Sequence, residues 1–261
     1  KSAAIVADSC RAAARDKINL ATFVEYSLRR SVAVVSENQG PMRDSQRPRY
    51  VRLTSSSYDP DRLDSALALF TNASMPVIRD KPGYQGVVTL LNRDHNRVMA
   101  MTFWGADASD DLLGLDPETM GDVLSISRSW TSPLVRETYS VYVFEIRERE
   151  RLVPGAAHAR LTTIRVRPEY WDAVVAAGHD VADALEHEQS GFIGAVGLGD
   201  RITGKATFVE LWENRAALRA SETTAYRQER AARAARMLIG VPQHSIFHIE
   251  HLDLGPLQTV S

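Results

Sequence analysis

Alternation of apolar and polar positions along the second half of the chain predicts a compact order of strands and helices. Strand-like alternation and helical spacing of apolar residues follow one another in the order strand, helix, strand, strand, helix, strand. The predicted segments are 159–166, 169–187, 192–198, 205–212, 215–238 and 245–252. This order is that of a ferredoxin-like unit, an antiparallel sheet with helices on one face.

The first half carries the same pattern at a nearly constant distance along the chain. Arg52-Leu53-Thr54 recurs as Arg160-Leu161-Thr162, an offset of 160 − 52 = 108 residues. The same offset relates Pro60 to Pro168, Asp64 to Asp172, Gly83 to Gly191, Gly86 to Gly194, Arg93 to Arg201 and Trp104 to Trp212. The last strands match best at 105, residues 140–146 with 245–251, which predicts a length difference around 114–133. These matches predict a tandem duplication.

Three regions follow from this reading. Residues 1–49 form a helical N-terminal extension and linker, residues 50–150 the first ferredoxin-like repeat, and residues 156–255 the second. Each repeat leaves one face of its sheet uncovered, so we expect the two sheets to bury each other. The predicted fold class is therefore α+β, two tandem βαββαβ repeats closing into one intramolecular barrel.

The second repeat resembles the antibiotic biosynthesis monooxygenase family, whose fold is the dimeric α+β barrel. The resemblance rests on Arg165–Pro168, on Ser190–Gly194, and most of all on the run Phe208–Leu218. The first repeat keeps Trp104 but has Thr102 where the second has Glu210.

The resemblance implies small-molecule chemistry. Members of the family oxidise anthrone-like phenols with molecular oxygen and no cofactor, degrade haem, isomerise lactones or cyclise polyketides. A histidine early in the last helix is common in the family. Here the matching stretch, Ala220–Thr223, contains none. This departure weighs against haem degradation, and no cofactor is expected.

The composition of the chain limits the classes of partner that it is expected to bind. A formal net charge of −2 gives no support for a nucleic-acid partner. The single cysteine, Cys10, forms no intrachain disulfide and suits a cytoplasmic protein. No apolar stretch approaches the ~18 residues of a membrane span, and the first residues do not resemble a secretion signal. A homodimer is the assembly to test.

Aromatic and acidic residues at the end of the third predicted strand suggest a site. The indoles of Trp212 and Trp104 suit a planar aromatic ligand, although either ring can instead simply fill the core. Glu210 lies two residues before Trp212 and therefore on the same strand face. If buried in a pocket it is a candidate base; the alternative is an ion pair with an arginine. Phe192, Thr162 and Tyr226 are expected to help bind the substrate.

The histidines predict no metal site. His244 and His248 share a strand face but stand ~13 Å apart, too far for one zinc ion. His248 and His251 are expected on opposite faces. His248 alone is a candidate catalytic acid or base, with a structural histidine as the alternative.

These observations lead to one function and its alternatives. The leading hypothesis is a cofactor-independent monooxygenase that oxidises a polycyclic phenolic or anthrone-like aromatic molecule with O₂. The alternatives are a non-redox cyclase, isomerase or lyase, or a non-catalytic protein that binds a small molecule, including haem.

Overall fold

The computed structural model describes residues 47–106, 108, 130–146, 148–223, 229 and 232–254. They belong to one unit, Met42–Ser261. Nearly all of the predicted helical extension (1–49) lies outside the described residues, and so does Tyr226.

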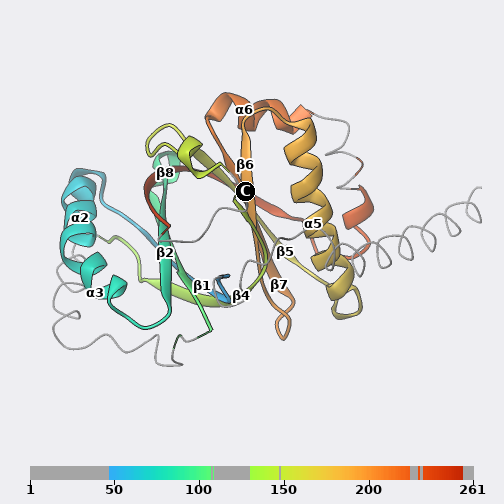
Figure 1. Ribbon diagram of the computed structural model, residues 1–261, viewed down its shortest axis with the longest axis horizontal. Coiled ribbons are helices and arrows are strands. Elements are labelled where there is room, and N and C mark those ends of the chain that lie inside the picture. Colours follow the sequence, from blue (N-terminus) through green and yellow to red (C-terminus); the bar gives the residue numbers. More distant parts are fainter. Residues whose placement is uncertain are drawn as a thin grey trace, which may run out of the picture. The chain divides into compact units, whose positions relative to one another are not determined.

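Eight antiparallel strands close into one barrel (Figure 1). Around the barrel they run β1 (Tyr50–Ser57), β3 (Arg97–Trp104), β2 (Tyr84–Asn92), β8 (Gln243–Asp253), β5 (His158–Arg165), β7 (Lys205–Trp212), β6 (Phe192–Asp200) and β4 (Val135–Ile146). The last strand of each half joins the two halves, because β4 pairs with both β1 and β6 and β8 pairs with both β5 and β2. The predicted closed α+β barrel is confirmed, and closure leaves no free sheet edge.

The two halves use the same strand register throughout. Tyr50 pairs with Trp104 and with Ser140, and the residues 108 positions later, His158, Trp212 and His248, pair in the same way. The last strands are therefore offset by 248 − 140 = 108, and the predicted offset of 105 was wrong. The strand pairing across the barrel sets this register. The sequence similarity between the two strands aligned them three residues away from it.

β-Bulges recur at equivalent places and change one expectation. The β2–β3 ladder shifts between Tyr84 and Gly86, and the β6–β7 ladder shifts between Phe192 and Gly194. In the β2–β8 ladder, His248 faces Leu91 and His251 faces Thr89, so Glu250 is the extra residue. A bulge of one residue restores a side chain to the face it would otherwise leave. His248 and His251 thus share a face, and the prediction of opposite faces was wrong.

The helices cover the outer face of the barrel. In the second half α5 (Trp171–Glu188) is continuous, whereas the first half has α2 (Leu63–Leu69), a π-helical turn (Phe70–Ser74) and α3 (Met75–Arg79). Pro76 explains the interruption, since proline lacks the N–H that an α-helical turn needs. α6 (Arg215–Ala220) is shorter than predicted and passes into a 3₁₀ turn. The 3₁₀ turns are Pro60–Arg62, Arg93–His95, Arg149–Arg151, Pro168–Tyr170 and Ser221–Thr223.

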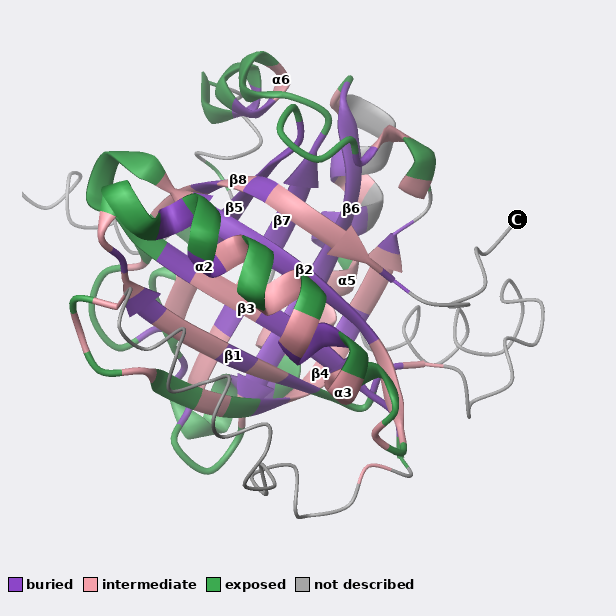
Figure 2. Ribbon diagram, turned by 90° about the vertical axis from the view of Figure 1, so that its left-hand side faces the viewer, coloured by how far each residue is buried: buried purple, intermediate pink, exposed green. Residues whose placement is uncertain are grey.

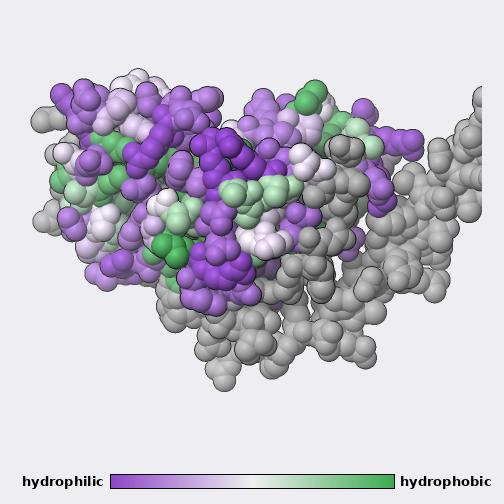
Figure 3. Space-filling model, turned by 90° about the horizontal axis from the view of Figure 1, so that it is seen from above, coloured by the Kyte–Doolittle hydropathy of each residue, from purple (hydrophilic) through white to green (hydrophobic). Residues whose placement is uncertain are grey.

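The apolar residues form two kinds of core, one inside the barrel and one between the barrel and the helices. The barrel interior is filled by apolar residues of both halves, among them Val51, Phe103, Val209 and Phe247. The outer layer packs α5 and α6 against one side and α2 and α3 against the other (Figure 1). Most strand residues are buried or half-buried, and the outward faces of α2 and α6 are exposed (Figure 2). Seen from above, hydrophilic side chains dominate the described surface, with separate smaller hydrophobic areas (Figure 3).

Among the helices described, none has the length and apolarity to cross a bilayer.

Candidate functional site

A row of outward-facing side chains crosses four neighbouring strands of the second half. His248, His158, Trp212 and Phe192 pair in this order from β8 to β6. The His248 and His158 rings lie 4.3 Å apart, and the Phe192 ring meets the Trp212 ring edge to face at 5.3 Å. The structure thus places three residues singled out from the sequence side by side. His158 was missed, because only the strand pairing puts it between them.

Glu210 lies on β7, two residues before Trp212, and its carboxylate is hydrogen-bonded to Arg160. Arg160 Nε donates to Glu210 Oε2 at 2.7 Å, and Nη2 donates to the same oxygen. Both side chains are almost fully buried, 3% and 4% exposed. The Arg160 guanidinium also lies over the Trp212 ring, 5.6 Å from its centroid. The ion pair expected as the alternative is therefore present, and Glu210 is not a free carboxylate.

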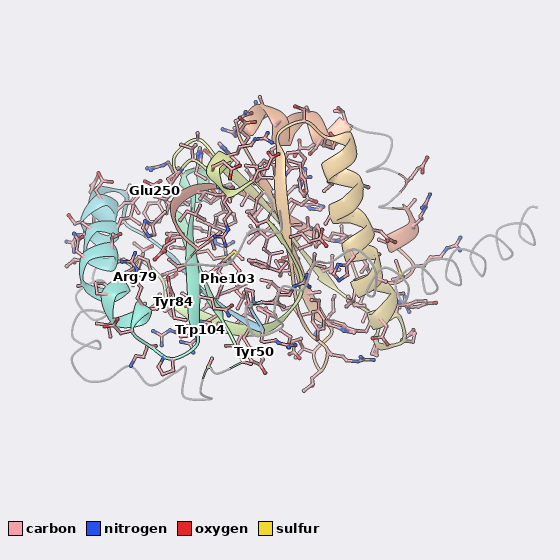
Figure 4. The ribbon with its side chains drawn as sticks, viewed as in Figure 1. Tyr50, Arg79, Tyr84, Phe103, Trp104 and Glu250 are labelled. Atoms are coloured by element: carbon pink, nitrogen blue, oxygen red, sulfur yellow. The ribbon has the colours of Figure 1, made fainter. Side chains whose placement is uncertain are left out.

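The first half has equivalent residues at the same strand positions, except that a threonine replaces the glutamate. Tyr50, Trp104 and Tyr84 occupy the row of His158, Trp212 and Phe192, on the side of the barrel that carries α2 and α3 (Figure 4). Thr102 stands in the place of Glu210 and accepts a hydrogen bond from Trp104 Nε1 at 3.0 Å. Arg52, the counterpart of Arg160, lies 5.9 Å from the Trp104 ring centroid.

His158 has the electronic state of a neutral base. Its Nδ1 lies 2.8 Å from the carbonyl oxygen of Ala156, which fixes the proton on Nδ1. Its Nε2 is buried and has no hydrogen-bond partner within the described structure. Burial lowers the pKa of His158, and the charges of His248 and Arg215 act in the same direction. In this tautomer Nε2 is a hydrogen-bond acceptor, and the lowered pKa disfavours its protonation.

Thr162 lies apart from this row. Its hydroxyl contacts His244 Nδ1 at 3.0 Å in an exposed position, four residues along β5 from His158. The structure therefore does not bring Thr162 together with Trp212.

A pocket of about 380 Å³ opens beside Phe192. It is lined by the end of β4, the start of β6 and the end of α5: Glu145, Glu148, Arg151, Ala182, Gln189, Ser190, Gly191, Phe192, Ile193 and Gly194. Glu145 also contacts His179 Nδ1 at 3.2 Å. Glu145 could not be recognised from the sequence, because β4 belongs to the first half and reaches this pocket only by pairing with β6.

Among the described side chains, no three histidine, cysteine, aspartate or glutamate residues gather as a metal site would require. The groups available are carboxylates, imidazoles and a guanidinium next to aromatic rings, which suits proton transfer to or from an aromatic molecule.

Comparison with known proteins places the fold. No family model and no curated protein matches the chain. Among solved structures, it is similar to a candidate monooxygenase from Fusobacterium nucleatum, with TM-score 0.63 and 12% identity over 80% of this chain and 95% of that one. A candidate monooxygenase from Lactobacillus acidophilus has TM-score 0.60 and 10% identity, covering 79% and 96% of the two chains. An anthrone oxidase-like protein has TM-score 0.58 and 15% identity, covering 83% and 98%. These likenesses confirm, at the level of the fold, the resemblance to monooxygenase-type barrels seen in the sequence.

Proposed function

We propose that the protein is a cofactor-independent monooxygenase that oxidises a polycyclic phenolic or anthrone-like molecule with O₂. The observation that carries the proposal is the pocket beside Phe192, in which one aromatic ring and the carboxylates of Glu145 and Glu148 meet. Its volume lies in the usual range for small-molecule sites, and a planar ring can stack against Phe192. The same fold occurs in an anthrone oxidase-like protein, and the substrate class is extended to this chain by that analogy.

Glu145 is the proposed base. Its carboxylate lines the pocket, and the contact with His179 orients it. Proton abstraction from an anthrone gives an electron-rich carbanion, which transfers electrons to O₂ and forms a peroxide at the same carbon. Loss of water from the peroxide leaves the quinone, so one oxygen atom enters the product and the other leaves as water. The residues supply the base and, in Phe192, an aromatic ring against which the substrate can lie.

Trp212 and the Arg160–Glu210 pair have a positioning role in this proposal. Trp212 is fully buried behind Phe192, and Arg160 lies over its ring. His158 and His248 lie on the other side of Trp212, where the buried Nε2 of His158 is a further hydrogen-bond acceptor. Glu210 and His248 thus remain part of the proposed machinery, with Glu210 acting through Arg160.

We further propose that the chain arose by tandem duplication. The equal strand registers, the recurring bulges and the exchange of last strands between the halves support this origin. A duplicated unit reproduces within one chain the interface that a dimer would form.

The test is anthrone turnover with and without oxygen, followed by mass spectrometry of the product. We expect quinone formation only in the presence of O₂. Glu145→Gln should lower kcat by about 100-fold or more, the usual worth of a general base. Glu169→Gln, which removes an exposed carboxylate outside the pocket, should leave kcat unchanged. Oxygen-independent turnover, or no turnover across a panel of phenols, would overturn the proposal.

A further inference from the structure

The first half contains a half-buried arginine, Arg52, in which two guanidinium nitrogens have no hydrogen-bond partner among the described residues. Arg52 lies between Val51 and Leu53, which point into the barrel core, so its side chain points outward toward the helix layer. Its Nε and Nη2 atoms are buried and have no hydrogen-bond partner in the described part of the chain. The same two nitrogens of Arg160 bind the Glu210 carboxylate. The two halves thus present one geometry, filled in the second and open in the first.

Among the described residues, no neighbouring carboxylate forms an ion pair with Arg52. Thr102 replaces the carboxylate, and its hydroxyl is already occupied by Trp104 Nε1 and by the Arg52 carbonyl oxygen. Asp253 lies in the same row of the sheet, two strands further on, but it binds Arg79 Nε at 2.7 Å. Burial, and then the charge of Arg136, lower the pKa of Arg52. An unpaired buried cation is costly, so this position favours an incoming anion.

Three further polar groups in the same layer also lack partners. Ser74 Oγ, Thr89 Oγ1 and His251 Nε2 are buried without a hydrogen bond within the described residues. At the positions 108 residues away stand Ala182 and Gly197 of the second half and Val143 of β4, which carry no polar side-chain atom (for His251 the matching position is 251 − 108 = 143). Buried polar groups are normally paired, so these unpaired atoms in one layer are hydrogen-bonding positions open to water or to a bound molecule.

We propose that the first half binds an aromatic carboxylate in the layer between the sheet and α2–α3. The carboxylate takes the place that Glu210 occupies in the second half and accepts from Arg52 Nε and Nη2 side by side. The aromatic ring lies against Trp104 and Tyr84, whose own rings meet edge to face at 5.8 Å. The hydroxyls of Ser74 and Thr89 and the imidazole of His251 serve polar substituents on the ring.

Binding of 2-naphthoate to the full chain, measured by calorimetry, tests this site. The neutral isostere 2-naphthamide should bind at least about 10-fold more weakly, because a charge-assisted bidentate contact is lost. Arg52→Met should weaken 2-naphthoate binding by about 10-fold or more. Arg97→Met, which removes an exposed arginine elsewhere, should leave binding unchanged.

Thr102→Glu provides the decisive variant. It builds into the first half the carboxylate that Glu210 supplies in the second, so it should abolish 2-naphthoate binding while leaving Tm equal or higher. Unchanged binding in Arg52→Met and Thr102→Glu would overturn the proposal, as would equal affinity for the amide. Binding is measured without turnover, so a failure here leaves the oxygenase proposal untouched, and the reverse also holds.

Discussion

Arg160 donates to Glu210 through Nε at 2.7 Å inside a layer that excludes water. A second hydrogen bond from Nη2 reaches the same carboxylate oxygen, and Nη2 also donates to Ser221 Oγ at 3.1 Å. Two desolvated charges of opposite sign therefore depend on each other. This relationship distinguishes the second half from the first, where Arg52 has Thr102 opposite it.

Loss of the carboxylate alone should destabilise the fold strongly. Glu210→Leu leaves Arg160 charged, buried and unpaired, a change that typically costs about 3–5 kcal/mol. Urea unfolding of the variant measures it. Glu222→Gln is the matched control: its carboxylate is 43% exposed and lies 3.9 Å from Arg160 Nη1, so its loss should cost no more than about 1 kcal/mol. Equal effects of the two variants would contradict the assignment.

Removal of both charges should restore much of the lost stability. In the double variant Arg160→Met with Glu210→Leu, no uncompensated charge remains, and such replacements are often neutral. We expect the double variant to be more stable than either single variant by at least about 1 kcal/mol. Additive losses would show that the two side chains act independently.

Much of the fold was open to prediction from the sequence, and the exceptions have physical causes. Alternation predicted the order of the elements along the chain, and the 108-residue offset predicted that Trp104 and Trp212 are equivalent, because both can be recognised in the sequence without knowing the strand pairing. The register of the last strands and the common face of His248 and His251 depend on pairing across the barrel and on the bulge at Glu250. His158 and Glu145 escaped notice for the same reason, since each joins the site through a strand partner distant in sequence.

His158 should make stability sensitive to acid. Burial lowers its pKa in the folded state below the usual value of 6.5, so the unfolded chain binds the proton more tightly. Stability is therefore full above about pH 6.5 and falls as the pH drops toward the folded pKa. His158→Gln should remove this part of the loss. We expect the free energy of unfolding of the native chain to fall more than that of the variant between about pH 7.5 and 5.5. Parallel curves would rule out the shifted pKa.

Gly194 should be essential where the two halves join. A Cβ there would lie 2.8 Å from Ile146 Cα and would also collide with the Glu145 carbonyl, both on the paired strand β4. Gly194→Ala should cost about 1–3 kcal/mol by forcing the strands apart, as measured by thermal unfolding. At Gly155, φ is +81° and no atom lies within 4 Å of the added Cβ. Gly155→Ala therefore isolates the backbone cost, about 1 kcal/mol. A Gly194→Ala variant as stable as the native chain would refute the close contact.

The proposed use of molecular oxygen is tested most directly by isotope labelling. Anthrone is incubated with the protein under ¹⁸O₂, and the product is analysed by mass spectrometry. The account predicts a quinone that carries one ¹⁸O atom, formed with the native chain and strongly reduced with Glu145→Gln. A product without ¹⁸O would contradict it. Equal amounts of labelled quinone from the native chain and from the Glu145→Gln variant would also contradict it.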